Sequence, residues 1–138
     1  MLMERTLVII KPGSVLKKNT GDIISRFEKK GFNIIAIKMI QLSKDEAQSF
    51  YYCHRGKDFF KMLVEFMISG PCVPMVIEGK SVIQRIRDFI GATDPKKAEP
   101  GTIRADFGTE MPKNAVHASD SIESARFEVN FFFPDKAF

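Results

Sequence analysis

The feature that most restricts the fold of this chain is an unbroken apolar run at positions 6–10, with the sequence Thr-Leu-Val-Ile-Ile. A strand with one face in water alternates apolar and polar residues, whereas a continuous run of this kind is typical of a strand buried on both faces. The run ends at Lys11 and Pro12, because proline cannot continue the hydrogen-bond ladder. The chain must therefore cover a central strand on both sides, and Lys11 lies at the C-terminal end of that strand.

The rest of the sequence changes between strand-like and helical patterns. Residues 13–19 are turn-like, residues 32–42 and 73–77 are predicted strands, and residues 115–116 form a short apolar strand just before a histidine. Apolar residues recur at helical spacing in five segments, near residues 23–30, 43–51, 59–67, 80–90 and 121–132. Residues 91–113 form a long irregular stretch, and loops of that length are usually functional.

Capping signals support the boundaries of three of these helices. Gly31 is placed to end the first helix as a C′ glycine. Ser43 with Glu46 has the spacing of a capping box, in which the two residues satisfy each other's backbone N–H groups. Asp120 with Glu123 has a similar spacing before the last helix.

The order of the predicted elements is β, α, β, α, α, β, α, loop, β, α. This order indicates an α+β fold with a ferredoxin-like split β-α-β-β-α-β core, in which helices cover a four-stranded antiparallel sheet. A doubly wound parallel sheet is the alternative, but the sequence has no G-x-G-x-x-G or G-x-x-x-x-G-K-[ST] loop to support it. The length of 138 residues predicts a single domain over residues 1–138.

Charge and composition narrow the class of function. The 21 basic and 17 acidic residues give a formal charge of +4, which suits an anionic ligand such as a phosphate but does not by itself indicate nucleic-acid binding. Cys53 and Cys72 form no C-x-x-C motif, and with only two histidines as well, a structural zinc site is not expected. Charges interrupt the apolar runs, so no membrane span is predicted. We expect a cytoplasmic protein, because it has few thiols and no signal-peptide pattern.

Residues 114–121, Asn-Ala-Val-His-Ala-Ser-Asp-Ser, hold one of the two histidines. A strand-to-helix junction there would fix the imidazole beside hydroxyl groups and free backbone N–H groups, which can bind anions. A single histidine near serine and aspartate is more often an ordinary structural residue. The segment is informative because four other segments of the chain match the same family pattern.

Together the five segments resemble the nucleoside diphosphate kinase family, and they extend from Glu4 to Phe132. In chain order they are Glu4-Arg5-Thr6 with Ile10-Lys11-Pro12; Tyr51 with Phe59-Phe60; Ser69-Gly70-Pro71 with Glu78-Gly79; Gly91-Ala92-Thr93-Asp94-Pro95 with Pro100-Gly101-Thr102-Ile103-Arg104; and the His117 segment. Each segment alone is weak evidence, whereas five in order at family-like spacing are specific. The resemblance implies transfer of the terminal phosphate of a nucleoside triphosphate, usually ATP, to a nucleoside diphosphate.

The resemblance also implies roles for the catalytic residues. His117 would be the nucleophile that becomes phosphohistidine, and the reaction would be of the ping-pong type. Glu128 would bond the other ring nitrogen and fix its tautomer, and Ser119 would help to hold Glu128. Lys11 and Tyr51 would complete the catalytic set. Without the resemblance, Glu128 would be read as a surface residue and Tyr51 as an ordinary helix-end residue.

The remaining implied residues bind the nucleotide. Lys11, Arg87 and Arg104 supply cations for the phosphates, since phosphoryl transfer depends mainly on positioning and charge neutralisation. By resemblance, Thr93 would supply a further hydroxyl donor, and Asn114 would contact the sugar. Phe59 and Met111 would lie against the two faces of the base. Mg²⁺ would arrive with the nucleotide phosphates and need no protein ligand. Considered singly, each of these residues also fits a solvated surface, loop or core position.

Two departures from the family pattern bear on activity. The family usually has Lys-Pro-Asp-Gly where this chain has Lys11-Pro12-Gly13-Ser14, and Ala118 replaces the glycine after the catalytic histidine. Alanine disfavours positive φ, so Ala118 would constrain the backbone if the family geometry needs that freedom. We therefore expect Ala118→Gly to be tolerated, and to raise activity if that constraint exists.

The main alternative is a binding module without catalysis. A split β-α-β-β-α-β fold with a basic isoelectric point is also the format of RNA-binding domains that stack bases on sheet aromatics. No RNP1-like pattern supports that reading, so no nucleic acid is required as a partner. A degenerate kinase fold that serves as a scaffold is a further possibility. The family resemblance implies a homo-oligomer, either a hexamer or a tetramer.

Overall fold

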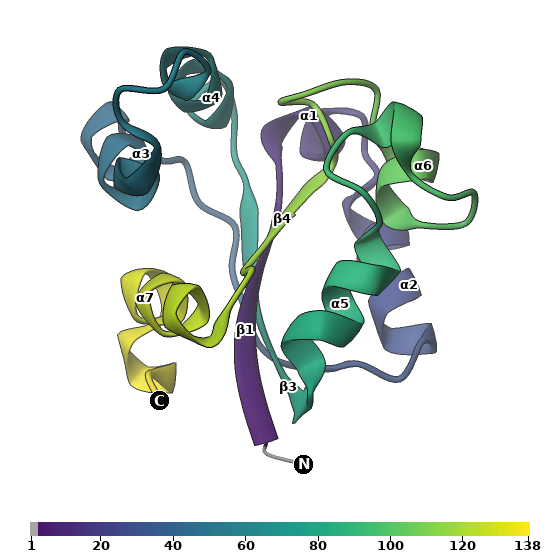
Figure 1. Cartoon of the computed structure of the whole chain (residues 1–138). Coiled ribbons are helices and arrows are strands. Elements are labelled where there is room, and N and C mark those ends of the chain that lie inside the picture. The colour runs from purple at the N-terminus through teal and green to yellow at the C-terminus, as the bar shows by residue number, and fades with distance from the viewer. Residues whose placement is uncertain (1–2) are drawn as a thin grey trace.

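The structure is a computed structural model that describes residues 3–138. Four strands form one sheet in the order β2-β3-β1-β4, and every neighbouring pair is antiparallel. The strands are β1 (Met3–Ile10), β2 (Asn33–Ile37), β3 (Val73–Lys80) and β4 (Val116–Ala118). This arrangement confirms the predicted α+β fold with a four-stranded antiparallel sheet (Figure 1).

Seven α-helices and three short 3₁₀ turns join and cover these strands among the described residues. The helices are α1 (Pro12–Leu16), α2 (Thr20–Lys29), α3 (Lys44–Phe50), α4 (Phe60–Met67), α5 (Val82–Ile90), α6 (Ile103–Phe107) and α7 (Ile122–Phe132). The 3₁₀ turns are η1 (Tyr52–His54), η2 (Pro95–Lys97) and η3 (Pro134–Lys136). Helices α2 and α5 are the two crossover helices of the split β-α-β-β-α-β core, while α3 and α4 are inserted between β2 and β3.

The central strand β1 is buried on both faces, as the run at positions 6–10 predicts. Val8 and Ile10 face one core, where α2 and α5 pack, whereas Leu7 and Ile9 face the other, where α3, α4 and α7 pack. Figure 1 shows these two groups of helices on opposite sides of the sheet. Each of the four side chains is fully buried, so the sheet has no open face at its centre.

Two of the predicted helix boundaries are confirmed in detail. The Ser43 hydroxyl accepts from the Glu46 N–H at 3.1 Å, and the Glu46 carboxylate accepts from the Ser43 N–H at 2.9 Å. This reciprocal pair is the capping box that starts α3. Gly31 follows α2 at φ +96°, a left-handed conformation that glycine adopts without a Cβ clash.

The second strand is shorter than predicted. Residues 32–42 were expected to be extended throughout, but β2 ends at Ile37, and beyond it Ile40 makes only an isolated bridge to Cys72. The register with β3 also shifts between Ile34 and Ala36. The sequence pattern indicates only the local preference for extended backbone. The length of a strand also depends on a neighbouring strand that keeps the same register, so the predicted length was too great.

Two regions predicted as irregular contain short helices. In residues 13–19, α1 begins directly after Lys11 with Pro12 at its first position, where a missing N–H costs nothing. In residues 91–113, the Thr102 hydroxyl accepts from the Ala105 N–H at 3.3 Å and caps α6. Both helices span only five residues, too few to produce a helical period in the sequence.

The segment around the second histidine also differs from its prediction. His117 lies inside β4, opposite Ile9, and does not follow the strand. Ala115 was expected in the strand but has φ +73°, which is unusual for a residue with a Cβ. Ser121 is the cap of α7, because its hydroxyl accepts from the Ser124 N–H at 3.1 Å. The side chain of Asp120, expected to cap α7, accepts a hydrogen bond from the Ser124 hydroxyl at 2.6 Å.

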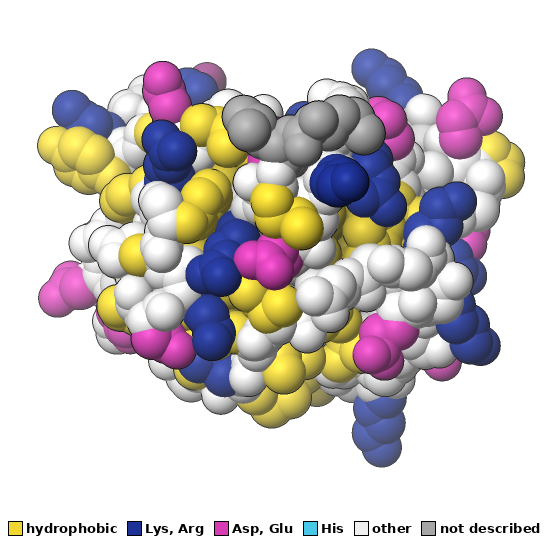
Figure 2. All heavy atoms as spheres, turned by 90° about the horizontal axis from the view of Figure 1, so that it is seen from below, with side chains coloured by type: hydrophobic (Ala, Val, Ile, Leu, Met, Phe, Trp, Pro, Cys, Tyr) yellow, Lys and Arg dark blue, Asp and Glu magenta, His cyan; other side chains and the backbone are white. Residues whose placement is uncertain are grey.

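The outer surface mixes charges of both signs. Figure 2 shows the face at the N-terminal end of β1, where basic, acidic and apolar side chains are interspersed. Between β1 and β3, Arg5 pairs with Glu78 at 2.8 Å. Within residues 3–138, no helix has the length and apolar character needed to cross a membrane.

Candidate active site

A cavity of about 350 Å³ lies between the α3–α4 region and the segments that carry β4, α5 and α6. It brings together residues that are far apart in sequence. The predicted site residues that line it are Lys11, Tyr51, Phe59, Arg87, Thr93, Arg104, Met111, Asn114, His117 and Glu128. Ser119, the remaining predicted residue, is fully buried behind the cavity wall.

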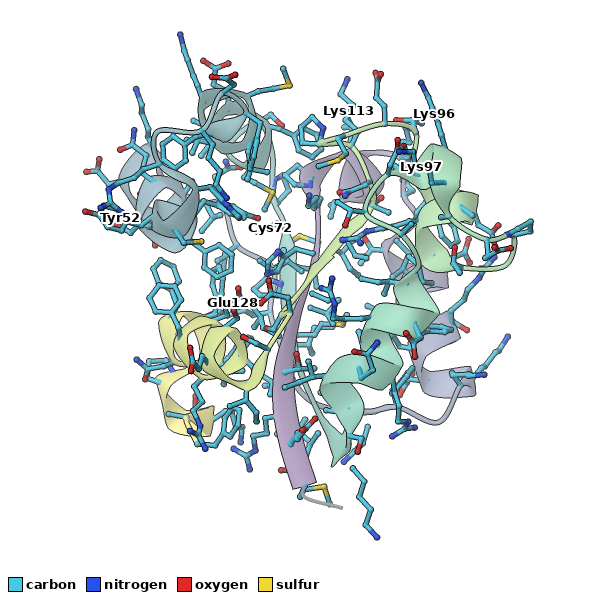
Figure 3. The ribbon with its side chains drawn as sticks, viewed as in Figure 1. Tyr52, Cys72, Lys96, Lys97, Lys113 and Glu128 are labelled. Carbon is cyan, nitrogen blue, oxygen red and sulfur yellow. The ribbon has the colours of Figure 1, made fainter. Side chains whose placement is uncertain are left out.

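A chain of hydrogen bonds orients the histidine in this cavity. His117 Nε2 lies 2.8 Å from Glu128 Oε1, and the Ser119 hydroxyl donates to the same carboxylate oxygen at 2.7 Å. The Leu7 N–H in turn donates to the Ser119 hydroxyl at 3.2 Å, which ties the chain to the central strand. Figure 3 shows Glu128 reaching from α7 toward the sheet. Because Glu128 holds Nε2, Nδ1 is the ring nitrogen left for chemistry.

Aromatic side chains fix the plane of the imidazole. Phe50 packs edge-on against His117 with ring centroids 5.4 Å apart, and Tyr51 does so at 6.0 Å. Both residues lie at the end of α3, whose capping box defines where that helix starts. Helix α3 thus supplies the wall against which the imidazole is held.

Lys11 is buried at the end of β1 and belongs to a second network. Its Nζ donates to Asn114 Oδ1 at 2.7 Å and to the Pro112 carbonyl at 3.2 Å. Asn114 Nδ2 donates to the Thr93 carbonyl at 2.9 Å. Burial, together with the nearby charge of Arg104, lowers the pKa of Lys11 to about 7. An anion in the cavity would restore the charged form, because an opposite charge favours the ammonium.

Arg104 presents a second buried cation. Its Nη1 and Nη2 donate to the Gly91 carbonyl at 3.2 Å and the Val116 carbonyl at 3.0 Å, which locks the guanidinium plane. Burial and the neighbouring Arg87 lower the pKa of Arg104 to about 10, so it stays charged at neutral pH. The fixed plane is suited to hydrogen bonds with two phosphate oxygens at once.

Two buried donors at the cavity lack a partner within the described part of the chain. They are the Tyr51 hydroxyl and Arg104 Nε. Burial raises the pKa of Tyr51, with Glu128 adding to the effect, so its phenol remains a neutral donor. Buried polar groups without partners are rare, and each calls for an explanation such as a ligand. An anion bound between Lys11 and His117 would supply acceptors in this region.

The opposite end of the cavity is apolar and open. Phe59 is 42% exposed and Met111 is 51% exposed, although both line the cavity. Large apolar side chains that remain exposed on a cavity wall are available to cover a flat ring. The cavity therefore has a cationic, buried end and an apolar, exposed end.

The carboxylates of the cavity do not form a metal site. Asp120 and Glu128 are the acidic residues that line it, and Glu128 is already bonded to His117 and Ser119. Among residues 3–138 there is no group of three or more His, Cys, Asp or Glu side chains that could hold a metal ion. This donor set fits Mg²⁺ that is held mainly by phosphate oxygens and water, which is the coordination that Mg²⁺ prefers.

Comparisons with known proteins identify the family. The family model described as nucleoside diphosphate kinase matches residues 4–138. The chain belongs to the nucleoside diphosphate kinase family. A nucleoside diphosphate kinase of Anaeromyxobacter dehalogenans is 56% identical over 135 residues, which are 98% of this chain and 92% of that protein. One of Bordetella pertussis is also 56% identical, over 98% of this chain and 96% of that protein.

A solved structure supports the same assignment. The crystal structure of the Aquifex aeolicus nucleoside diphosphate kinase superposes with a TM-score of 0.93 at 50% sequence identity, and the match covers 96% of each chain. The family membership predicted from the five segments and the ferredoxin-like fold predicted from the order of the elements are therefore confirmed.

The family pattern did not indicate every residue of the cavity. Cys53, His54, Met62, Asp120 and Ser124 also line it, and His54 is the last residue of η1. His54 packs on Tyr51 and Phe59, with ring centroids 6.4 and 5.2 Å away, and burial lowers its pKa. The sequence spacing could have indicated two of these residues. His54 and Met62 each follow a predicted site residue by three positions, which is about one helical turn.

The structure shows how the chain accommodates the two departures from the family pattern. Ala118 lies in β4 opposite Val8, in extended backbone, so its Cβ causes no positive-φ strain. Gly13 lies in α1, and a Cβ there would come within 3.2 Å of the Phe66 ring. Neither departure removes a side chain from the His117, Lys11 or Arg104 arrangement.

Proposed function

We propose that this protein transfers the terminal phosphate of a nucleoside triphosphate, usually ATP, to a nucleoside diphosphate, and so maintains nucleoside triphosphate pools. The observation that carries the proposal is the placement of His117, oriented through Nε2 by Glu128, in one cavity with Lys11, Arg87 and Arg104. The activity of the similar nucleoside diphosphate kinases supports the same reaction.

In the first half-reaction, His117 Nδ1 attacks the γ-phosphorus of the donor. The new P–N bond forms as the bond from the γ-phosphorus to the β,γ-bridging oxygen breaks, and the nucleoside diphosphate leaves with that oxygen. The imidazole becomes phosphohistidine, with Nε2–H directed at Glu128. The carboxylate stabilises the positive charge that develops on the ring, and Ser119 keeps the carboxylate in place.

In the second half-reaction, a terminal oxygen of an acceptor diphosphate attacks the same phosphorus. The P–N bond breaks and the imidazole returns to its starting state. Direct transfer between two bound nucleotides would need two sets of phosphate-binding cations. The cavity holds one set, Lys11, Arg87 and Arg104, which supports a ping-pong reaction that uses one site twice.

The buried cations would act on the transferring phosphoryl group. Lys11 and Arg104 are held by hydrogen bonds to Asn114 and to backbone carbonyls before any substrate binds. Such preorganised donors stabilise developing charge without reorganisation at the moment of reaction. The unpartnered Tyr51 hydroxyl would donate to a phosphate oxygen, and Thr93 would supply a further hydroxyl.

Mg²⁺ would enter with the nucleotide and be held by its phosphate oxygens and by water. When bound, it neutralises phosphate charge and orients the chain of phosphates. Asn114 would contact the sugar, while Phe59 and Met111 would cover the two faces of the base. Because these apolar contacts read no base edge, we propose that the protein accepts many bases.

We also propose that residues 1–138 act as one domain that assembles into a homo-oligomer, a hexamer or a tetramer, in the cytoplasm. Two free thiols are consistent with a reducing compartment. A binding module for RNA is disfavoured, because helices cover both faces of the sheet and leave its centre no open aromatic platform.

Labelling tests the mechanism directly. Protein mixed with γ-labelled ATP and Mg²⁺, without acceptor, should take up label on His117 that is stable in base and labile in acid. Unlabelled GDP should then discharge it as labelled GTP. His117→Ala should take up no label, whereas His54→Gln, which alters the other histidine of the cavity, should still be labelled.

Other results would overturn parts of the proposal. Turnover without labelling, or labelling on Ser119 or Ser121, would exclude the phosphohistidine. Nucleotide binding with neither turnover nor label would favour a scaffold, and RNA binding without turnover would favour an RNA-binding module.

A further inference from the structure

Two methionines lie at the open end of the cavity. Met62 comes from α4, and Met111 comes from the segment before β4. Their side chains are 58% and 51% exposed, so both thioethers are accessible to small solutes. Both residues also line an adjoining outer hollow of about 540 Å³. Each methionine therefore stands at the boundary between the cavity and the outside.

Helical geometry places Met62 next to the apolar platform. Met62 follows Phe59 by three residues, so the two side chains lie on the same face at the start of α4. Met111 approaches from a segment that is distant in the sequence, next to Pro112 and the Lys11 network. A ring that stacks on Phe59 would be in contact with the region that these two thioethers occupy.

The other described methionines provide an internal comparison. Met67 and Met75 are fully buried in the core. Met3 and Met39 are 61% and 57% exposed, as open as the cavity pair, but they do not line the cavity. Exposure alone therefore does not distinguish Met62 and Met111, whereas contact with the cavity does.

We propose that Met62 and Met111 form an oxidation-sensitive pair that controls nucleotide affinity, an inference that rests on the proposed function. The oxidant is a peroxide such as hydrogen peroxide. The thioether sulfur attacks one peroxide oxygen, the O–O bond breaks, the sulfur is oxidised by two electrons to the sulfoxide, and the other oxygen leaves as water. The product is polar and chiral, whereas the thioether is apolar and flexible.

The sulfoxide weakens nucleotide binding because of where it lies. A base on Phe59 excludes water from the adjacent methionines, so the sulfoxide oxygen loses hydration without gaining a donor from the apolar wall. Oxidation of both residues should lower the affinity for ADP by about tenfold, the scale of one buried polar group without a partner. A bound nucleotide should also shield both sulfurs from peroxide.

Site-resolved oxidation tests the proposal on the intact protein. The protein is treated with hydrogen peroxide with and without saturating ADP, quenched with catalase, incubated with dithiothreitol to reverse sulfenic acid or disulfide at Cys53, and analysed by mass spectrometry. ADP should slow sulfoxide formation at Met62 and Met111 at least severalfold, while Met3 and Met39 should oxidise at unchanged rates.

Affinity measurements complete the test. Calorimetry with ADP should show the loss in oxidised protein, and methionine sulfoxide reductases A and B should restore binding. The double variant Met62→Leu/Met111→Leu should bind ADP equally well before and after peroxide treatment. The control double variant Met3→Leu/Met39→Leu should lose affinity after peroxide, as the unsubstituted protein does.

The inference is overturned if ADP protects neither cavity methionine, if full oxidation changes affinity less than twofold, or if the Met62→Leu/Met111→Leu protein loses as much as the original. Untreated protein from the same preparation is assayed for His117 labelling. Labelling without an oxidation effect refutes only this inference, while absence of labelling and of ADP binding refutes the proposed function.

Discussion

The two ends of the cavity are built in opposite ways. Under the proposed function, the cationic end of the cavity holds the phosphates and the apolar end holds the base. At the phosphate end, Lys11 and Ser119 directly follow β1 and β4, and Arg104 on α6 donates to the Val116 carbonyl of β4. All three side chains are buried. At the base end, Phe59 and Met111 are about half exposed on a helix start and an irregular segment. The cationic side chains are thus supported by the core, whereas the apolar side chains lie at the periphery.

The difference has a physical basis. Charge stabilisation depends strongly on distance and on exclusion of water, so the phosphate end gains from rigid supports. Stacking and apolar contact depend weakly on exact geometry and are similar for every base. We therefore expect substitutions at the phosphate end to affect the rate strongly, and substitutions at the base end to affect binding moderately.

The largest effect is expected at the buried cations. Lys11→Ala and Arg104→Ala should each lower kcat by roughly 10²–10³, the scale for removal of one preorganised donor. Steady-state assays with ATP and GDP measure this loss. Lys96→Ala is the control, because Lys96 is exposed and lies far from Glu128 in Figure 3. Near-normal rates in folded Lys11→Ala or Arg104→Ala would remove that cation from the proposed mechanism.

A smaller effect is expected at the base platform. Phe59→Ala should weaken nucleotide binding by about 1–3 kcal/mol, the measured range for one base–aromatic stack, with less effect on kcat. Titrations with ADP and CDP measure the change. Phe127→Ala is a matched control, since Phe127 is 52% exposed on α7 and does not line the cavity. An equal loss in both variants would indicate a general change in packing.

The same platform should give little discrimination between bases. Initial rates with GDP, CDP, UDP and dTDP should agree within about two orders of magnitude, because one edge-specific polar contact is worth only ~1–3 kcal/mol. Acceptance of a single base to the near exclusion of the others would show that a polar contact reads the base edge.

Proton uptake should accompany phosphate binding. The pKa of Lys11 is lowered to about 7 in the free protein, and a bound phosphate should raise it. Above about pH 7 the free amine is then largely neutral and gains a proton on binding, so affinity falls as pH rises. Calorimetry with ADP at about pH 8, where phosphates are already deprotonated, in buffers of different ionisation enthalpy measures the uptake. Lys11→Ala should abolish this uptake.

The smallest effect is expected at Ala118. The residue lies in extended strand, so glycine relieves no strain, and the gain in activity that the family pattern suggested has no structural basis. Ala118→Gly should still be tolerated, with a loss of about 0.5–1 kcal/mol in stability from glycine in a strand. Thermal unfolding and kcat measure both effects. A large fall in turnover with intact folding would show that the alanine Cβ supports His117.

The sequence by itself determined the sheet, the helices that cover it and the catalytic candidates. The run at positions 6–10 predicted a doubly covered strand, and hydrophobic periodicity located α2, α3, α4, α5 and α7, because these signals are local and repeat over several turns. The family resemblance named ten residues of the cavity wall and Ser119 behind it. The capping box at Ser43 was readable because its two partners are three residues apart.

Only the tertiary structure decided which atoms meet. The bond from His117 Nε2 to Glu128, and so the choice of Nδ1 for chemistry, depends on the packing of α7 against the sheet. The position of His117 inside β4 was likewise beyond the sequence. Each is set by contacts between segments distant in the chain, for which a single sequence carries no local period or spacing.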